Sequence, residues 1–488
     1  MSMRTWTLVL VGTSLLAACS ADPTSPLAIG TVQLVSGDGQ TGTPGVPLDD
    51  TLTVKVLDQT GRSPMSGVAV QWSVQDGGGT FDHALDTTDL QGMAHAVWTL
   101  GAMPGANNAV ATVGDLPGVE FSASADGLRA VAVALGNGFA CAIDVGHKGW
   151  CWGFGWFGEL GNGATGPVVG QTYHPQAVTG GHTFVDIAVN FNAACGLDAS
   201  GTDWCWGSNT FGQLGSPSPA NTGTPMAVSG APPFRGLAQG GNSNATCAIA
   251  ADSTGYCWGD NRFGQTGAGT FGGMVTAPQA MSGGLKFRSI TLGSVWGCGI
   301  VSDGTAWCWG SNSNGELGTG TPGNSAVPVP VAGAYHFTTL SAGNSYTCGL
   351  TNETGWVCWG LVSAIPPLQT TAWPTPIHAS SLDGMTEFDP GFFLGAAVLG
   401  GRALMVFAVN SQRTAGAPIP IYAVHASDTN ACGLTAGGQV YCWGYNDGGQ
   451  LGSPFEYGWE PGYTPAQMVV APNAETQLGT SPSRSPSH

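Results

Sequence analysis

The sequence has very few charged side chains, and cations are the scarcer kind. Lys and Arg together number 12 against 30 Asp and Glu in 488 residues, which gives a formal net charge of −18. Charged residues make up 9% of the chain, whereas an average soluble domain has about 25%. Because phosphate binding requires cations, this composition argues against a nucleic-acid partner and against docking on anionic lipid through basic patches.

Long uninterrupted apolar runs are also absent. The nearest candidate for a membrane span, residues 392–409, is broken by Gly395, Gly400, Gly401 and Arg402. A shorter apolar run, residues 6–18, follows Arg4; it is too short to span a membrane comfortably and fits the apolar region of a signal peptide.

That run ends in Leu16-Ala17-Ala18-Cys19, which resembles the lipobox of bacterial lipoproteins. The resemblance implies that residues 1–18 are removed and that Cys19 carries acyl chains, which hold a protein stably on a membrane. Ser20 follows the cysteine and, by analogy with enterobacterial sorting, favours the outer membrane. We therefore expect an outer-membrane lipoprotein of the bacterial cell envelope, or a secreted protein if the peptide is an ordinary signal with an incidental cysteine.

Local motifs of catalysis and cofactor binding are missing as well. The sequence contains no HExxH, no GxSxG nucleophile elbow, no P-loop and no calcium loop of alternating Asp residues. We therefore expect no metal, no cofactor, no nucleotide and no enzymatic activity. A carboxylate pair assembled from different repeats would leave no local motif, so a hydrolase with a site between repeats remains an alternative.

Cysteine, in contrast, is regularly spaced. Apart from Cys19, twelve cysteines form six pairs that are each ten residues apart, and the second member always opens Cys-Trp-Gly. The pairs are Cys141 with Cys151, Cys195 with Cys205, Cys247 with Cys257, Cys298 with Cys308, Cys348 with Cys358, and Cys432 with Cys442.

A glycine six residues after the first cysteine, as at Gly201, Gly304 and Gly438, indicates a three-residue hairpin loop that ends in a left-handed glycine. Such a loop places the two cysteines opposite each other, with Cα atoms about 4.5–5.5 Å apart, a distance that suits a disulfide. An exported chain meets an oxidising compartment, so we expect six disulfides. Zinc is the less favoured alternative, because zinc ligands usually lie two to four residues apart and no histidine recurs in register.

The pairs define a repeat of about 50 residues. First cysteines lie 54, 52, 51 and 50 residues apart as far as Cys348, and the last interval is 84. The repeat template fits that long interval with Met385, Phe388 and Gly391 at its opening positions. It then places Ala396 and Val406 at the cysteine positions and Phe407 at the tryptophan position. Seven units of four short strands therefore run from about residue 128 to residue 470, which is typical of a β-propeller.

The turn Asn209-Thr-Phe-Gly212-Gln213-Leu214-Gly215 and its copies carry a more specific resemblance. This turn, the period and the seven copies resemble the regulator-of-chromosome-condensation propeller family. The resemblance implies a rigid disc whose loops grip another protein. The family's eukaryotic founder promotes nucleotide exchange on a nuclear GTPase, an activity that export from the cytoplasm contradicts.

Residues 29–126 alternate apolar and polar side chains between glycine-rich turns, a pattern that predicts a β-sandwich with Trp72 and Trp98 in its core. The segments 52–61 and 67–72 resemble the invasin-type bacterial immunoglobulin-like domain. The fold class is therefore all-β: an immunoglobulin-like β-sandwich at 29–126 and a seven-bladed propeller with one degenerate blade at 127–470. A short linker at 19–28 precedes them, and a Ser/Pro-rich tail at 471–488 is expected to be disordered.

Aromatic residues in the inter-strand loops are the candidate contacts, because exposed aromatics often anchor interfaces. They are Trp156, Phe157, Tyr173, Phe211, Phe263, Phe271, Phe455, Tyr457 and Trp459, with Trp156, Phe455, Tyr457 and Trp459 as the main candidates. The expected function is non-catalytic binding of an unknown protein at the cell surface. The alternative to a protein partner is a glycan, bound as by a lectin-like adhesin.

Overall fold

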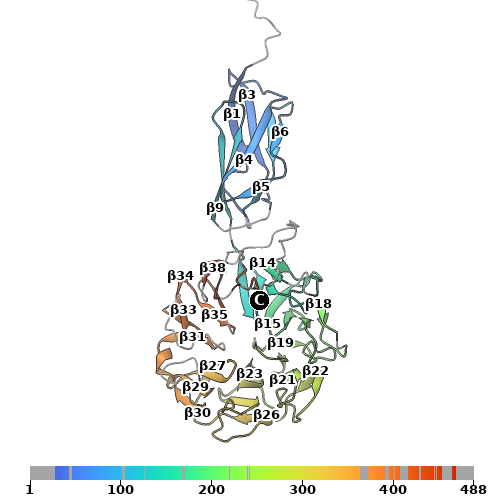
Figure 1. Cartoon of the computed structure of the whole chain (residues 1–488), viewed down its shortest axis with the longest axis vertical. Coiled ribbons are helices and arrows are strands. Elements are labelled where there is room, and N and C mark those ends of the chain that lie inside the picture. The colour runs from blue at the N-terminus through green and yellow to red at the C-terminus, as the bar shows by residue number, and fades with distance from the viewer. Residues whose placement is uncertain are drawn as a thin grey trace, which may run out of the picture.

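The computed structural model describes residues 28–468, apart from 43–46, 102–104, 126, 167–170, 219, 239, 241, 363–371, 391–394, 401, 407–415, 428–429, 445, 447 and 453–463. Within these residues the chain forms β-strands and a single 3₁₀ turn, η1 (Ser380–Leu382). Figure 1 shows a ring of small sheets and, beyond its rim, a second group of sheets built from the N-terminal strands. The strands β1–β10 and the ring strands β11–β38 therefore form separate all-β units.

The N-terminal unit contains three sheets with the orders β1-β3-β7, β2-β10-β9-β4-β6 and β5-β8. Their strands are β1 (Ile29–Ser36), β2 (Gln40–Gly42), β3 (Leu52–Asp58), β4 (Ala69–Asp76), β5 (Gly79–Phe81), β6 (Leu85–Thr87), β7 (Met93–Ala96), β8 (Trp98–Leu100), β9 (Gly105–Thr112) and β10 (Val119–Ala125). Alternate residues of β4 and β10 are buried, as the sequence pattern indicates. All three sheets contribute to one core that contains Trp72, Trp98 and Phe121, so both tryptophans lie where the pattern placed them.

The ring consists of seven four-stranded antiparallel sheets in the described residues, each formed by four consecutive strands. The first sheet contains β11 (Ala130–Leu135), β12 (Phe139–Asp144), β13 (Gly149–Phe154) and β14 (Gln171–Ala177). The second contains β15 (Phe184–Val189), β16 (Ala193–Asp198), β17 (Asp203–Gly207) and β18 (Thr222–Ala227). The third contains β19 (Phe234–Leu237), β20 (Ala245–Ala250), β21 (Gly255–Asp260) and β22 (Met274–Ala280).

The next two sheets are β23 (Phe287–Leu292), β24 (Trp296–Val301), β25 (Ala306–Gly310) and β26 (Ser325–Pro330); and β27 (Phe337–Ala342), β28 (Tyr346–Thr351), β29 (Gly355–Leu361) and β30 (Ala372–His378). The last two are β31 (Met385–Pro390), β32 (Gly395–Leu399), β33 (Arg402–Val406) and β34 (Gly416–Pro420); and β35 (Ala423–Ala426), β36 (Asn430–Leu434), β37 (Val440–Gly444) and β38 (Thr464–Met468). The first strand of each sheet lies nearest the ring axis and the fourth lies at the rim (Figure 1).

The hairpin between the second and third strands has the expected loop. In the second sheet the amide of Asp198 donates to the carbonyl of Thr202 at 3.0 Å. Gly201, the last loop residue, has a φ of 85°, so residues 199–201 form a three-residue loop that ends in a left-handed glycine. This loop sets the register of the two cysteine-bearing strands.

All six cysteine pairs expected from the sequence form disulfides. In each pair the two residues lie directly opposite each other on the second and third strands of one sheet. The bonds join Cys141 to Cys151, Cys195 to Cys205, Cys247 to Cys257, Cys298 to Cys308, Cys348 to Cys358, and Cys432 to Cys442. Their Cα–Cα distances are 4.0–4.1 Å. These distances are slightly shorter than the separation of about 4.5–5.5 Å expected for opposed residues. All twelve side chains are buried, and the six disulfides expected from the spacing are present.

The sixth sheet corrects another prediction. Ala396 pairs with Met405 and not with Val406, and Val406 pairs with Gly395. The reason is the loop, which joins the paired residues Leu399 and Arg402 and so holds two residues where the other hairpins hold three. The tryptophan position of this repeat is therefore occupied by Val406 instead of Phe407.

Neighbouring sheets are joined by the tryptophan that follows the second cysteine. Its ring is buried in all six disulfide-bearing sheets, and in five of them its indole N–H donates to a backbone carbonyl in the turn of the preceding sheet around the ring. These bonds are Trp206 to Glu159, Trp258 to Gln213, Trp309 to Gln265, Trp359 to Glu316 and Trp152 to Gln450, at 2.7–3.0 Å. We call this contact the Trp–turn bond; the tryptophan is thus core packing, as expected.

Candidate functional site

The turn after the third strand is a rigid platform built by its own side chains. In the second sheet the Asn209 side-chain oxygen accepts from the Leu214 amide at 3.0 Å, and the Gln213 side-chain oxygen accepts from the Phe211 amide at 2.9 Å. The Asn209 side-chain amide also donates to the carbonyl of Ser218. Because three side-chain bonds satisfy the backbone locally, the residue before the turn glycine is free to point outward.

Three successive sheets place phenylalanine at that outward position. Phe157 and Phe263 are each 38% exposed, and Phe211 lies 5.1 Å from the Arg262 guanidinium, a cation–π distance. Trp156 is 51% exposed and Phe271 is 56% exposed. We call Trp156, Phe157, Phe211, Phe263 and Phe271 the aromatic face; the fourth sheet has Asn314 at the equivalent position.

The aromatic face includes one of the main sequence candidates, Trp156. Phe455, Tyr457 and Trp459 lie outside the described residues, as does Cys19. Tyr173, on β14, is half-buried. The Trp156 ring also contacts Phe154, with ring centroids 5.4 Å apart, and its contact role stays a prediction.

An acidic side chain lies directly beneath the first turn. Glu159 is 3% exposed and occupies the position of Gln213 and Gln265 in the next two sheets, and its carboxylate accepts from the Phe157 amide at 2.8 Å. Burial raises the pKa of Glu159 to about 7, although hydrogen bonds from the turn backbone oppose the shift.

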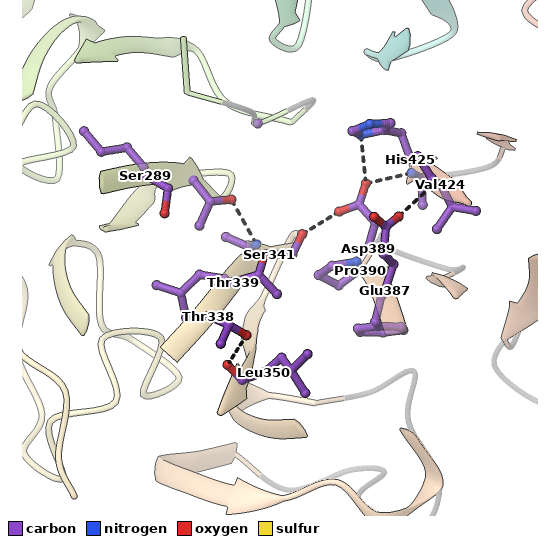
Figure 2. A pocket seen from close by; sticks show the side chains of 18 of the residues that line it. Ser289, Thr338, Thr339, Ser341, Leu350, Glu387, Asp389, Pro390, Val424 and His425 are labelled. Atoms are coloured by element: carbon purple, nitrogen blue, oxygen red, sulfur yellow. Dashed lines mark hydrogen bonds and ion pairs between the residues drawn. The ribbon is translucent and has the colours of Figure 1, made fainter. Parts of the chain in front are cut away.

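A second feature is the central channel, a cavity of about 600 Å³ lined by the innermost strands. Its polar lining residues include Ser289, Thr339, Ser341, Glu387 and Asp389, and all five are labelled in Figure 2. This volume lies within the range of known small-ligand sites, about 300–1,000 Å³.

The carboxylates of the channel reach the next sheet. Asp389 accepts from the Ser341 hydroxyl at 2.5 Å and from the Ala426 amide at 2.8 Å, and His425 lies 3.8 Å away. Glu387 accepts from the Val424 amide at 3.1 Å (Figure 2). These side chains therefore cap N–H groups on the inner edge of β35.

Two arginines make the complementary contact on the other side of the channel. The Arg235 guanidinium donates to the carbonyl of Phe287 at 2.7 Å, and the Arg288 guanidinium donates to the carbonyl of Phe337 at 2.8 Å. Sequence reasoning did not single out any charged residue of the channel. An alignment of the repeats on their opening residues would have placed the two arginines and the two carboxylates on the innermost strands, which meet at the ring axis.

No metal site emerges from the described residues. Cys195, Asp203 and Cys205 lie close together, but both thiols are in a disulfide and cannot ligate an ion. Four of the described histidines lie beside a carboxylate, such as His336 with Glu353 at 2.8 Å and His378 with Asp383 at 2.9 Å. Within the described residues, no helix has the length and apolar character to cross a membrane.

The ring and its repeated turns define the class of this protein as all-β with a β-propeller. The solved yeast protein Prp20p (Saccharomyces cerevisiae) has a similar fold, with a TM-score of 0.55 and 17% identity over 70% of this chain and 87% of Prp20p. Prp20p itself has binding properties to Gsp1p and histones. At that identity the likeness shows the fold alone.

The family models identify the repeats. The regulator of chromosome condensation (RCC1) repeat matches residues 200–247 and 303–350, and a second RCC1 repeat model matches residues 184–213 and 421–450. The chain therefore contains RCC1 repeats, as the turn motif indicated.

Curated relatives share these repeats over part of their length. The human E3 ubiquitin-protein ligase HERC2 is 30% identical over 182 residues, 35% of this chain and 4% of HERC2. The ultraviolet-B receptor UVR8 of Arabidopsis thaliana is 25% identical over 205 residues, 42% of this chain and 46% of UVR8. The chain spans less than half the length of these relatives.

Proposed function

We propose that this protein is an extracytoplasmic, lipid-anchored and non-catalytic scaffold that binds a protein partner through loops of its propeller. The propeller would have seven blades, the sixth of them degenerate, and residues 29–126 would form an immunoglobulin-like spacer that holds it away from the membrane. RCC1-like propellers bind protein partners and are mostly regulators or interaction scaffolds. Six buried disulfides indicate an oxidising compartment.

The aromatic face is the observation that carries the proposal. Four of its five aromatic side chains are exposed, and a side-chain oxygen in the turn accepts from the amide of Phe157, Phe211 and Phe263, so binding would cost little ordering entropy. Rigid aromatic anchors of this kind are typical hot spots of protein interfaces.

The binding proposal is tested by capture from an envelope extract with the full chain as bait. Trp156→Ala combined with Phe263→Ala should reduce recovery of a specific partner at least tenfold. The control is Tyr422→Ala, because Tyr422 is also 51% exposed but precedes β35. First and third strands run in the same direction, so Tyr422 lies at the face opposite to the turns that follow the third strands.

The same experiment separates the alternatives. Loss of capture with Tyr422→Ala and not with the double variant would reject the aromatic face. Binding of the chain to a glycan array, lost in the double variant, would favour the carbohydrate alternative over a protein partner.

The anchor is tested separately. Mass analysis of the exported protein should find an acylated Cys19 at its N-terminus, and Cys19→Ala should release it into the soluble fraction. An unprocessed or unmodified N-terminus would reject the lipoprotein proposal and leave the binding proposal standing.

A further inference from the structure

The central channel contains charges of both signs that do not meet. Arg235 and Arg288 come from β19 and β23, whereas Glu387 and Asp389 come from β31. Among the described residues neither arginine forms an ion pair, although acidic residues outnumber Lys and Arg by 30 to 12 over the chain. The folded chain therefore keeps opposite charges apart within one cavity.

The arginine side of the channel offers unused donors. Each guanidinium uses only its Nη2 in the bonds to Phe287, Ser253 and Phe337, so its other N–H groups have no partner among the described residues. The hydroxyls of Ser289 and Thr339 line the same cavity and likewise make no hydrogen bond there. A planar carboxylate matches such donors, because a guanidinium can bind it with two parallel bonds.

The carboxylate side of the channel offers an acceptor without a donor. Glu387 uses one oxygen to accept from Val424, and its second oxygen has no partner in the described residues. Burial raises the pKa of Glu387, and the neighbouring Asp389 carboxylate adds to the shift. A cationic group placed here would relieve that repulsion and complete the hydrogen bonding.

The spacing suits a short peptide. Arg235 and Arg288 are each the second residue of their innermost strand, β19 and β23. Asp389 is the fifth residue of β31, so it lies three residues further along the ring axis. Three residues along a strand correspond to about 10 Å. An extended tri- or tetrapeptide spans about 10–14 Å and fits a cavity of this volume.

We propose that the channel binds a short dipolar peptide, with its carboxylate on Arg235 and Arg288 and its ammonium group at Glu387 and Asp389. This site is independent of the aromatic face, so either proposal can fail alone.

The test uses tetraserine in four forms titrated into the full chain at low salt. The forms have both termini free, only the carboxylate free, only the amine free, or both blocked. The doubly free peptide should bind at least tenfold more tightly than the doubly blocked one, with the two singly charged forms in between. Equal affinity for all four forms would overturn the proposal.

Two variants that each remove one charge assign the roles of the two sides. Arg288→Gln should remove the advantage of a free carboxylate and keep the advantage of a free amine. Glu387→Gln should do the reverse, since glutamine can still accept from Val424. Arg262→Gln, outside the channel, should leave all four affinities unchanged. Thermal unfolding of each variant confirms that it is folded, and equal losses for every peptide in a folded channel variant would overturn the assignment.

A fifth peptide distinguishes the two sources of such a ligand. Lys-Ser-Ser-Asp with blocked termini carries its charges on side chains, as an internal segment of a longer chain would. Binding as tight as that of free tetraserine supports a segment of a partner protein, and binding of the free form alone supports a free oligopeptide; both outcomes require the dipolar channel.

Discussion

The indole N–H of Trp152 donates to the backbone carbonyl of Gln450 at 3.0 Å, across 298 residues of sequence. This Trp–turn bond joins the first sheet of the ring to the last. The Ala130 amide also donates to the Gly438 carbonyl at 2.6 Å. At the same junction Gly449 lies so close to β14 that an added Cβ would be 2.4 Å from the Thr172 carbonyl oxygen. In the described residues the ring therefore closes by contacts between complete sheets and not by a shared strand.

Removing the closing bond should destabilise the whole ring. Trp152→Phe keeps an aromatic ring but loses the N–H donor and leaves the buried Gln450 carbonyl without it. We expect a loss of about 2–3 kcal/mol in the free energy of unfolding, from lost packing and the lost hydrogen bond. Chemical denaturation measures it.

Trp443→Phe is the matched control. Trp443 is equally buried, but its indole N–H has no partner among the described residues. The substitution should therefore cost only packing, and the loss should be about 1 kcal/mol smaller than at Trp152. Equal losses would mean that the Trp–turn bond adds no stability.

The sixth sheet should exchange its amide hydrogens fastest. It is the only one of the seven described sheets without a disulfide, because Ala396 pairs with Met405 where two cysteines pair elsewhere. Hydrogen exchange read by mass spectrometry should show less protection in residues 395–406 than in the equivalent hairpin 245–260. Equal protection would contradict a stabilising role for the disulfides in the folded ring.

The sequence predicted the features that recur in each repeat, namely the cysteine pairing and the turn after the third strand. A constant interval of ten residues was enough to place Cys195 opposite Cys205, and the Asn209–Gly215 turn was enough to indicate the family of the repeat. Sequence reasoning failed where the structure depends on a change in loop length or on a contact with the next sheet. The hairpin of the sixth sheet is one residue shorter, which moved Val406 by one position. The role of Arg288 depends on the carbonyl of Phe337 in the next sheet, a contact that no pattern within one repeat encodes.

A serine occupies a loop position that favours glycine. Ser253 has a φ of 71° at the place where Gly201 and Gly304 stand in neighbouring sheets. A side chain in this conformation costs about 1 kcal/mol. Ser253→Gly should therefore raise the free energy of unfolding by about 0.5–1 kcal/mol. Loss of the weak hydrogen bond from Arg235 to the Ser253 hydroxyl, at 3.3 Å, reduces this gain. Gly201→Ala should change it in the opposite direction. A destabilised Ser253→Gly protein would show that the Arg235 contact outweighs the strain.

The carboxyl of Glu159 should make stability depend on pH. Its pKa is about 7 in the folded chain and near the ordinary value of 4.5 when unfolded. Below about pH 4.5 both states hold the proton and the group's contribution is constant. Between pH 4.5 and 7 only the folded state retains it, so the free energy of unfolding falls as pH rises, by about 3 kcal/mol in total.

Glu159→Gln isolates this effect, because glutamine is the residue that the next two sheets use at the same place and its side-chain oxygen can still accept from Phe157. The other carboxyls with raised pKa, such as Asp186 and Glu387, are present in both proteins and cancel in the comparison. The variant should therefore gain stability over the parent as pH rises from 5 to 8, and the two should converge towards pH 4. Parallel stability curves across this range would show that Glu159 ionises at an ordinary pKa and that the turn below Phe157 admits water.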